Sequence, residues 1–186
     1  PLPVVITRHG PIMNFGDSGT RDLAGDSPLG EVPENYGLAL KWTALEPGTV
    51  LSAFLGVNLA TNFEEFQASL ALYTAPSQNF VYADVEGNIG YVMPGWVPIR
   101  QPNHSGLLPV PGWTDEYEWL GLIPTEELPF SYNPPIGYIY TANNAVVGPD
   151  YPYVISYDWD YGYRAERIRQ MLEEYTADGS ITMADM

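Results

Sequence analysis

The alternation of hydrophobic and polar positions predicts short strands near the start of the chain. Residues 4–7 read Val-Val-Ile-Thr, a β-branched run typical of a buried strand, and Gly10-Pro11 would end it. Residues 14–37 are rich in Gly, Asp, Ser, Pro and Asn, so we expect a loop there with a short hairpin at its base. Residues 38–45 are apolar again and predict another strand, followed by a turn at residues 46–48.

Two later segments carry apolar residues at helical spacing. The first begins near Thr61, which has the spacing of a capping box with Glu64, and one face then carries Phe63, Phe66, Leu70 and Tyr73. The second covers residues 162–175, with one side formed by Ile168, Met171, Leu172 and Tyr175. Ser180 has the character of an N-cap, so we expect a third helix to begin there.

The clearest strand signal is a hairpin. Residues 79–84 and 89–93 form two strand-like runs, and the turn between them contains Gly87-Asn88. After a Pro- and Trp-rich connection, residues 138–142 predict one more strand. Nothing in the pattern marks an internal boundary, so we expect one mixed α+β domain over residues 1–186.

The charge of the chain excludes several classes of partner. Among 186 residues, 7 Lys and Arg stand against 23 Asp and Glu, which gives a formal net charge of −16. Such a surface repels phosphate groups, so neither nucleic acid nor an anionic membrane surface is expected as a partner. The longest mostly apolar stretch, residues 50–60, is too short to cross a bilayer.

The inventory of reactive side chains is also short. The chain contains no cysteine, which removes disulfides, thiol nucleophiles and zinc–thiolate sites. Its two histidines, His9 and His104, are too few for a multi-histidine metal centre. The chain begins at Pro1 rather than Met and stops at Met186 within an expected helix, so we expect an internal piece of a longer polypeptide, truncated at both ends.

Arg164 lies in the first turn of the second expected helix, where the helix dipole disfavours a cation. Such a placement calls for a local partner. One interpretation is an ion pair with Asp158, Asp160 or Glu166. The other is an arginine fork that holds a functional group in place.

Asn143-Asn144 follows the predicted strand 138–142 and also has two interpretations. Asparagine at the end of a strand commonly satisfies the backbone groups of a loop. An asparagine amide can instead direct an N–H toward a developing oxyanion. The residues alone do not decide between them.

The remaining candidates favour structural roles. A lone histidine such as His9 is more often a hydrogen-bonded structural residue than a base, and no Ser-His-Asp order is convincing. Acids at positions 150, 158 and 160 could bind calcium, but they lack EF-hand spacing, so a solvated acidic loop is the default. The 5 Trp and 14 Tyr residues could line a ligand pocket or pack the Pro-rich connection.

Several segments together resemble one known family in order and in register. Residues 79–91 read NFVYADVEGNIGY, and the later segments are LPVPGW (108–113), EWLG (118–121), NP with GYI (133–139), ANN (142–144) and GYRAERI (162–168). Thr7–Pro11 and Lys41–Thr43 match earlier elements of the same pattern. This series resembles the penicillin acylase (penicillin amidase) family over nearly the whole chain.

The resemblance implies an N-terminal-nucleophile hydrolase, in which a precursor cuts itself and the new N-terminal serine attacks an amide. Its α-amino group acts as the base, since such groups titrate near neutral pH. By resemblance, Asn143 falls on the oxyanion-hole asparagine, Arg164 on the arginine that orients the active site, and Trp42 near the substrate pocket wall. The implied fold is part of a four-layer αββα sandwich with antiparallel sheets.

The nucleophilic serine is expected to lie outside this chain, so these residues alone should be inactive. The expected partners are a small-molecule N-acyl amide, the small subunit and the remainder of the large subunit of the same precursor. No cofactor is required, although a structural calcium ion near Gly106 and Asp158 stays open. The resemblance also favours a periplasmic or secreted protein.

Two other readings stay open. The first is a non-catalytic, acidic and aromatic-rich β module that binds a carbohydrate or another small ligand. The second is a structural segment stabilised by calcium, which a rise in melting temperature on calcium addition would reveal.

Overall fold

The structure of the chain is a computed structural model that describes residues 4–13, 36–177, 179 and 181–184. The chain divides into two compact units. Unit 1 comprises Pro1–Gly48 and Trp96–Leu122, and unit 2 comprises Thr49–Gly95 and Ile123–Met186. Each unit is therefore built from two separate stretches of chain. Whether both belong to one partial domain stays a prediction.

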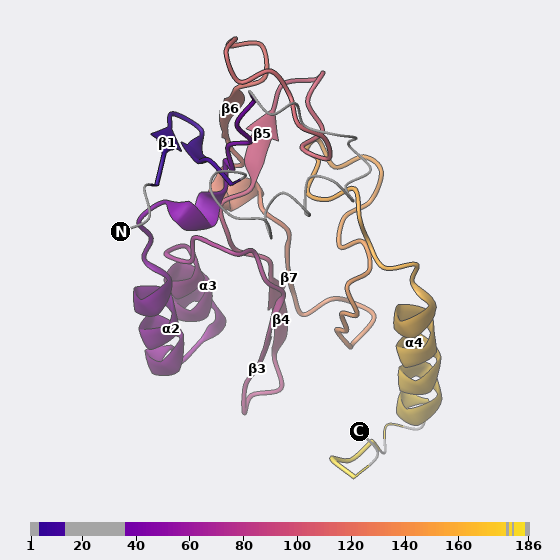
Figure 1. Ribbon diagram of the computed structural model, residues 1–186. Coiled ribbons are helices and arrows are strands. Elements are labelled where there is room, and N and C mark those ends of the chain that lie inside the picture. Colours follow the sequence, from indigo (N-terminus) through magenta and orange to yellow (C-terminus); the bar gives the residue numbers. More distant parts are fainter. Residues whose placement is uncertain (1–3, 14–35, 178, 180, 185–186) are drawn as a thin grey trace. The chain divides into compact units, whose positions relative to one another are not determined.

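Unit 2 begins with two helices that pack against each other, α2 (Val50–Leu59) and α3 (Phe63–Leu70) (Figure 1). A Cβ atom on Gly56 of α2 would lie 2.6 Å from Oγ of Ser69, so glycine at this position allows the helices their close approach. Helix α2 escapes prediction from periodicity because its apolar residues lie around the whole helix rather than along one face.

Helix α3 begins one residue later than the predicted capping box. Its N-cap is Asn62, whose side chain accepts the N–H of Glu65 at 2.9 Å. Glu65 in turn accepts the N–H of Thr61 at 2.8 Å, so the pairing of Thr61 with Glu64 is wrong by one position. An asparagine side chain caps a helix as well as a threonine does. With Asn62 as the N-cap, Glu65 is the third residue of the helix, the position from which a glutamate side chain can accept a backbone N–H that precedes the helix.

The predicted apolar face of α3 is confirmed. The buried core of unit 2 joins this face to α2 and to a strand and consists of Ala53, Phe63, Phe66, Leu70, Tyr73 and Val92. Helix α3 covers strand β4 (Ile89–Val92) at Gly90, where a Cβ atom would lie 2.3 Å from the Phe63 ring. Only glycine lets the ring approach the strand this closely.

The predicted hairpin is also confirmed. Strand β3 (Phe80–Ala83) pairs antiparallel with β4, and β7 (Phe130–Tyr132) pairs with the other edge of β4, giving the order β3-β4-β7. Asp84 closes the turn by accepting the backbone N–H groups of Glu86 at 3.0 Å and Asn88 at 2.9 Å. Asn133, just after β7, donates to the Asn88 side chain at 2.9 Å.

The second half of unit 2 is mostly irregular. It contains the short 3-10 helix η2 (Thr125–Glu127) and, later, helix α4 (Tyr163–Thr176), which confirms the helix predicted over 162–175. The strand predicted over 138–142 is wrong, because this segment pairs with no neighbouring strand among the described residues. Ser180 lies outside the described residues.

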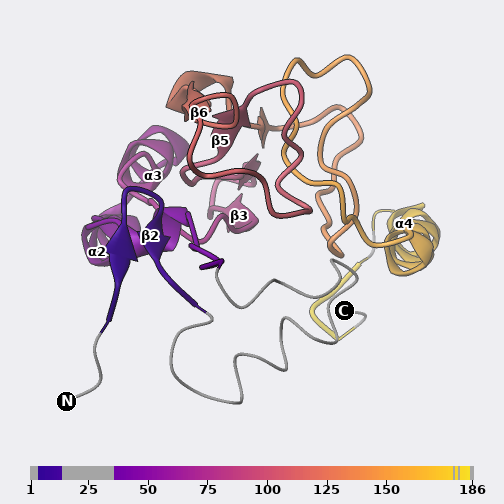
Figure 2. The same ribbon diagram turned by 45° about the horizontal axis from the view of Figure 1, so that its top comes forward.

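Unit 1 is held by two small antiparallel pairs. Strands β1 (Ile6–Thr7) and β2 (Gly10–Pro11) form one (Figure 2), and β5 (Pro98–Arg100) and β6 (Trp119–Leu122) form the other. The prediction of a buried strand over 4–7 is wrong, since β1 spans two residues and Val4 and Ile6 are exposed. A β-branched run without a second sheet layer gains strand geometry but no burial.

The strand predicted over 38–45 is wrong as well. Ala39 makes one isolated bridge to Ile12, and Thr43–Leu45 form the 3-10 helix η1. Most of the loop expected over 14–37 lies outside the described residues, so that prediction is untested. Within the described part of the chain, no helix is long and apolar enough to span a bilayer.

Candidate active site

Asn143 lies in a tight turn of unit 2 with its backbone in the left-handed region (φ 62°). Non-glycine residues rarely adopt this conformation, and asparagine tolerates it better than most. The carbonyl of Asn143 accepts the N–H of Asp160 at 2.9 Å, which ties the turn to the segment before α4. The unusual conformation is thus held by a specific long-range bond.

The side chain of Asn143 is oriented by Arg164, in the first turn of α4. Nη2 of Arg164 donates to Oδ1 of Asn143 and to the carbonyl of Ala142, both at 2.9 Å. A guanidinium group can only donate, so the amide oxygen faces Arg164 and the amide nitrogen Nδ2 points away from it. Asn143 is exposed, and no described residue forms a hydrogen bond with its Nδ2.

The neighbouring Asn144 has a different role. Its Oδ1 accepts the N–H of Ala142 at 3.1 Å, and its Nδ2 donates to the carbonyl of Ala145 at 3.0 Å. Both ends of this amide satisfy backbone groups of the turn, which is the usual function of asparagine in loops. Asn144 therefore stabilises the turn, whereas the amide nitrogen of Asn143 has no hydrogen-bond partner among the described residues.

Arg164 makes the ion pair that the first interpretation predicted, and whether it also holds a functional group stays a prediction. Its Nη2 pairs with Oδ2 of Asp160 at 3.1 Å, one of the three predicted partners, while the same nitrogen contacts Asn143. The hydrogen bond from Arg164 lowers the pKa of Asp160, so the carboxylate stays ionised at neutral pH. Asp160 therefore fixes the guanidinium group of Arg164, which in turn binds the Ala142 carbonyl and the Asn143 side chain.

A second line of hydrogen bonds supports the same turn from the hairpin. Tyr91 of β4 donates its hydroxyl to Oδ1 of Asn79 at 2.6 Å, and Nδ2 of Asn79 donates to Oγ1 of Thr141 at 2.8 Å. Thr141 is two residues before Asn143. These bonds fix the segment 138–142, which pairs with no strand among the described residues, and so hold the turn in place. They give Asn79 a positioning role that the sequence pattern alone did not reveal.

The other residues predicted for a site form no hydrogen bond with Asn143 or Arg164 within the described part of the chain, and their roles stay predictions. Trp42 is in unit 1, where it is half exposed and lines a cavity of about 300 Å³. Asp158 is exposed, and its N–H donates to Oγ of Ser156 at 3.0 Å. No three His, Asp or Glu side chains among the described residues converge to hold a metal ion. Because calcium is also bound by backbone carbonyls such as the one expected at Gly106, the calcium site stays a prediction.

Unit 1 contains an ion-pair cluster around Glu118. Its Oε1 pairs with Nε2 of His9 and its Oε2 with Nζ of Lys41, each at 2.6 Å. The hydrogen bond from Lys41, followed by that from His9, lowers the pKa of Glu118 to about 2. His9 is hydrogen-bonded, as its structural interpretation expects. The cluster could not be predicted from the sequence, because Lys41 and His9 lie 77 and 109 residues before Glu118.

We expect Glu118→Gln to lower the melting temperature of the full-length protein at neutral pH and to flatten its acid dependence. The pKa of Glu118 is about 2 in the folded state, below the ordinary 4.5, so its ionised carboxylate stabilises the fold above pH 4.5. This stabilisation is lost as the pH falls toward 2 and the carboxylate becomes protonated. The difference in melting temperature between the wild type and Glu118→Gln should therefore close over that interval. The exposed neighbour Glu116 supplies a control, and an equal response of Glu116→Gln would contradict the assignment.

Comparison with known proteins places these features in context. The family model described as penicillin amidase matches residues 1–186. The penicillin acylase 2 proenzyme of a Pseudomonas species is 37% identical over 175 residues, covering 91% of this chain and 20% of that protein. The penicillin G acylase of Escherichia coli is 38% identical over 141 residues, covering 75% and 16%. The acyl-homoserine lactone acylase QuiP of Pseudomonas fluorescens is 36% identical over 163 residues, covering 87% and 18%.

A solved structure agrees with these matches. The thermostable penicillin G acylase of Alcaligenes faecalis superposes with a TM-score of 0.59 at 28% identity, over 92% of this chain and 28% of that chain. The mixed helical and antiparallel architecture expected from sequence is therefore shared with that enzyme. The chain spans about a fifth of the length of the curated relatives it matches.

Proposed function

The chain belongs to the penicillin amidase family, and from this premise we propose that it supplies the oxyanion-binding part of the catalytic centre of an N-acyl amide hydrolase. One observation carries the proposal. Arg164 holds the amide oxygen of Asn143 and leaves the amide N–H groups exposed and free of described partners. A fixed N–H donor is what a tetrahedral intermediate of acyl transfer requires.

In the proposed reaction, an N-terminal serine from outside these residues attacks the carbonyl carbon of the amide. The serine α-amino group accepts the hydroxyl proton, and the carbonyl π electrons move onto the oxygen. Asn143 donates an N–H to that oxyanion. The intermediate then collapses, the C–N bond breaks, and the amine leaves with the proton. Water attacks the resulting ester to release the carboxylic acid and restore the serine.

Arg164 would act in this reaction through Asn143. Its guanidinium fixes the side-chain torsion of the asparagine, so that no reorientation is needed when charge develops on the substrate oxygen. The same hydrogen bond withdraws electron density from the amide oxygen and makes the opposite N–H a stronger donor. Arg164 is therefore a positioning residue in this proposal.

The names of the relatives support a proposal for the substrate class. They are named as penicillin acylases and acyl-homoserine lactone acylases, and both names describe removal of an acyl group from an amine. We place the substrate among such N-acyl amines. We also propose that the chain forms part of a four-layer αββα sandwich, with the small subunit and the rest of the large subunit as partners. Without the serine, these residues alone do not cleave amides.

The proposal is tested on the full-length purified protein. Intact mass spectrometry and N-terminal sequencing should find two polypeptides, the larger of which begins with serine. This material should release a free amine from N-acyl substrates of the penicillin or acyl-homoserine lactone type. A single uncleaved chain with no amine release from either substrate type would overturn the proposal.

A further inference from the structure

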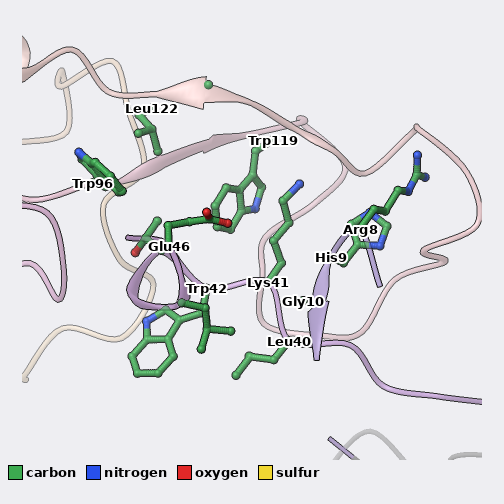
Figure 3. A pocket seen from close by; sticks show the side chains of 13 residues that line it. Arg8, His9, Gly10, Leu40, Lys41, Trp42, Glu46, Trp96, Trp119 and Leu122 are labelled. Atoms are coloured by element: carbon green, nitrogen blue, oxygen red, sulfur yellow. The ribbon is translucent and has the colours of Figure 1, made fainter. Parts of the chain in front are cut away.

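Unit 1 contains a cavity whose lining residues all belong to this unit. It measures about 300 Å³ and has three tryptophans in its wall, Trp42, Trp96 and Trp119 (Figure 3). Leu40, Leu45 and Leu122 complete the apolar part of the lining. This volume lies at the lower end of the range for small-molecule sites, and three indole rings give the cavity an unusually aromatic wall.

One indole of the cavity already carries a cation. Nζ of Lys41 lies 4.9 Å from the ring centre of Trp119, within the distance at which an ammonium group is attracted to an aromatic face. Trp42 and Trp96 have no such cationic partner among the described residues. The wall therefore retains indole surface of the kind that binds organic cations.

The basic side chains that line the cavity have acidic partners, whereas its acidic side chain, Glu46, has no basic partner among the described residues. Lys41 and His9 both pair with Glu118, and Arg8 pairs with Asp115 at 2.7 Å. Glu46, at the end of η1, is exposed and extends toward Trp119 in Figure 3. Its carboxylate forms no hydrogen bond or ion pair with any described residue. The uncompensated charge at this cavity is thus negative.

From these observations we propose that the cavity binds a small organic ammonium ion, with the cation against the indole faces and Glu46 as its counter-ion. An aromatic wall combined with a carboxylate selects a cation over a neutral molecule of the same shape. The net charge of −16 raises the local concentration of cations around the protein. The proposal concerns unit 1 alone and does not depend on amide cleavage.

The test is isothermal titration of the full-length protein with choline and with 3,3-dimethylbutan-1-ol, its uncharged carbon analogue. Choline should bind saturably, and the analogue should bind roughly 3- to 30-fold more weakly, which corresponds to one cation–π contact. Glu46→Gln and Trp42→Leu should each weaken choline binding by a similar factor. Trp42 is half exposed, so its replacement tests the aromatic wall with little risk to the fold.

Trp113→Leu and Glu86→Gln are the matched controls, since both residues are exposed and neither lines the cavity. Neither control should change the dissociation constant for choline, and melting temperatures would verify the fold of every variant. Absence of saturable choline binding would overturn the proposal. Equal affinity for the neutral analogue would also overturn it, as would an unchanged affinity in Glu46→Gln.

Discussion

Replacing Asn143 by Asp in the matured full-length enzyme is expected to lower kcat about 10²- to 10³-fold, the usual cost of one lost oxyanion donor. The aspartate has the same shape and keeps an oxygen for Arg164 to bind, but it has no N–H to give. Its negative charge would also oppose the developing oxyanion. Because the ion pair with Arg164 replaces the present hydrogen bond, the melting temperature should not fall.

Two further variants separate chemistry from backbone geometry. Asn143→Gly removes the amide but readily adopts the left-handed backbone, so it should lose turnover without strain. Asn144→Ala removes the two hydrogen bonds that stabilise the turn and should chiefly lower the melting temperature. Steady-state kinetics and thermal melting on the three variants test this division. Turnover close to wild type in Asn143→Asp would remove Asn143 from the oxyanion site.

Replacing Arg164 by Ala is the second substitution with a large expected effect, a fall in kcat of about 10- to 100-fold. A hydrogen bond to a charged group contributes about 1.5–3 kcal/mol, and here its loss frees the Asn143 amide to rotate away from the reacting carbonyl. The KM should change less than kcat, since the residue acts through Asn143 rather than on the bound substrate. Arg164→Lys should recover part of the rate, because an ammonium group can still donate to the amide oxygen.

Arg169 supplies the matched control on the same helix. It pairs with Glu166 and Glu173, both on α4, and forms no hydrogen bond with the turn. Arg169→Ala removes a positive charge of the same kind and should leave kcat unchanged, with at most a small loss of stability. If Arg169→Ala reduced turnover as much as Arg164→Ala, the effect would be one of helix stability and the positioning role would be wrong.

Elements set by local rules could be predicted from the sequence. The β3–β4 hairpin follows from the alternating runs 79–84 and 89–93 and from the turn residues between them, all within one short segment. Helix α4 follows from its apolar spacing. The same rules failed for residues 138–142, whose composition suits a strand but whose hydrogen bonds come from side chains such as Asn79. Periodicity also missed α2, because that helix is apolar on every side.

The motifs that suggested the family are largely structural. Asp84 and Asn88 close the hairpin turn, Asn133 braces it, and Gly90 makes room for Phe63. Such residues form a recognisable sequence motif because the hairpin turn or the close approach of a ring to the strand requires these residue types.

The sequence by itself determined the acidic surface, the absence of thiol and multi-histidine chemistry, and the ordered motifs that identify the family. It also singled out Arg164 as a cation in need of a local partner. Only the tertiary structure decided which of two adjacent asparagines has an amide N–H without a partner among the described residues. Asn143 and Asn144 are chemically identical, and they differ because a guanidinium 21 residues further along the chain reaches one amide and not the other. The direction in which a side chain points depends on such distant contacts, which local sequence does not encode.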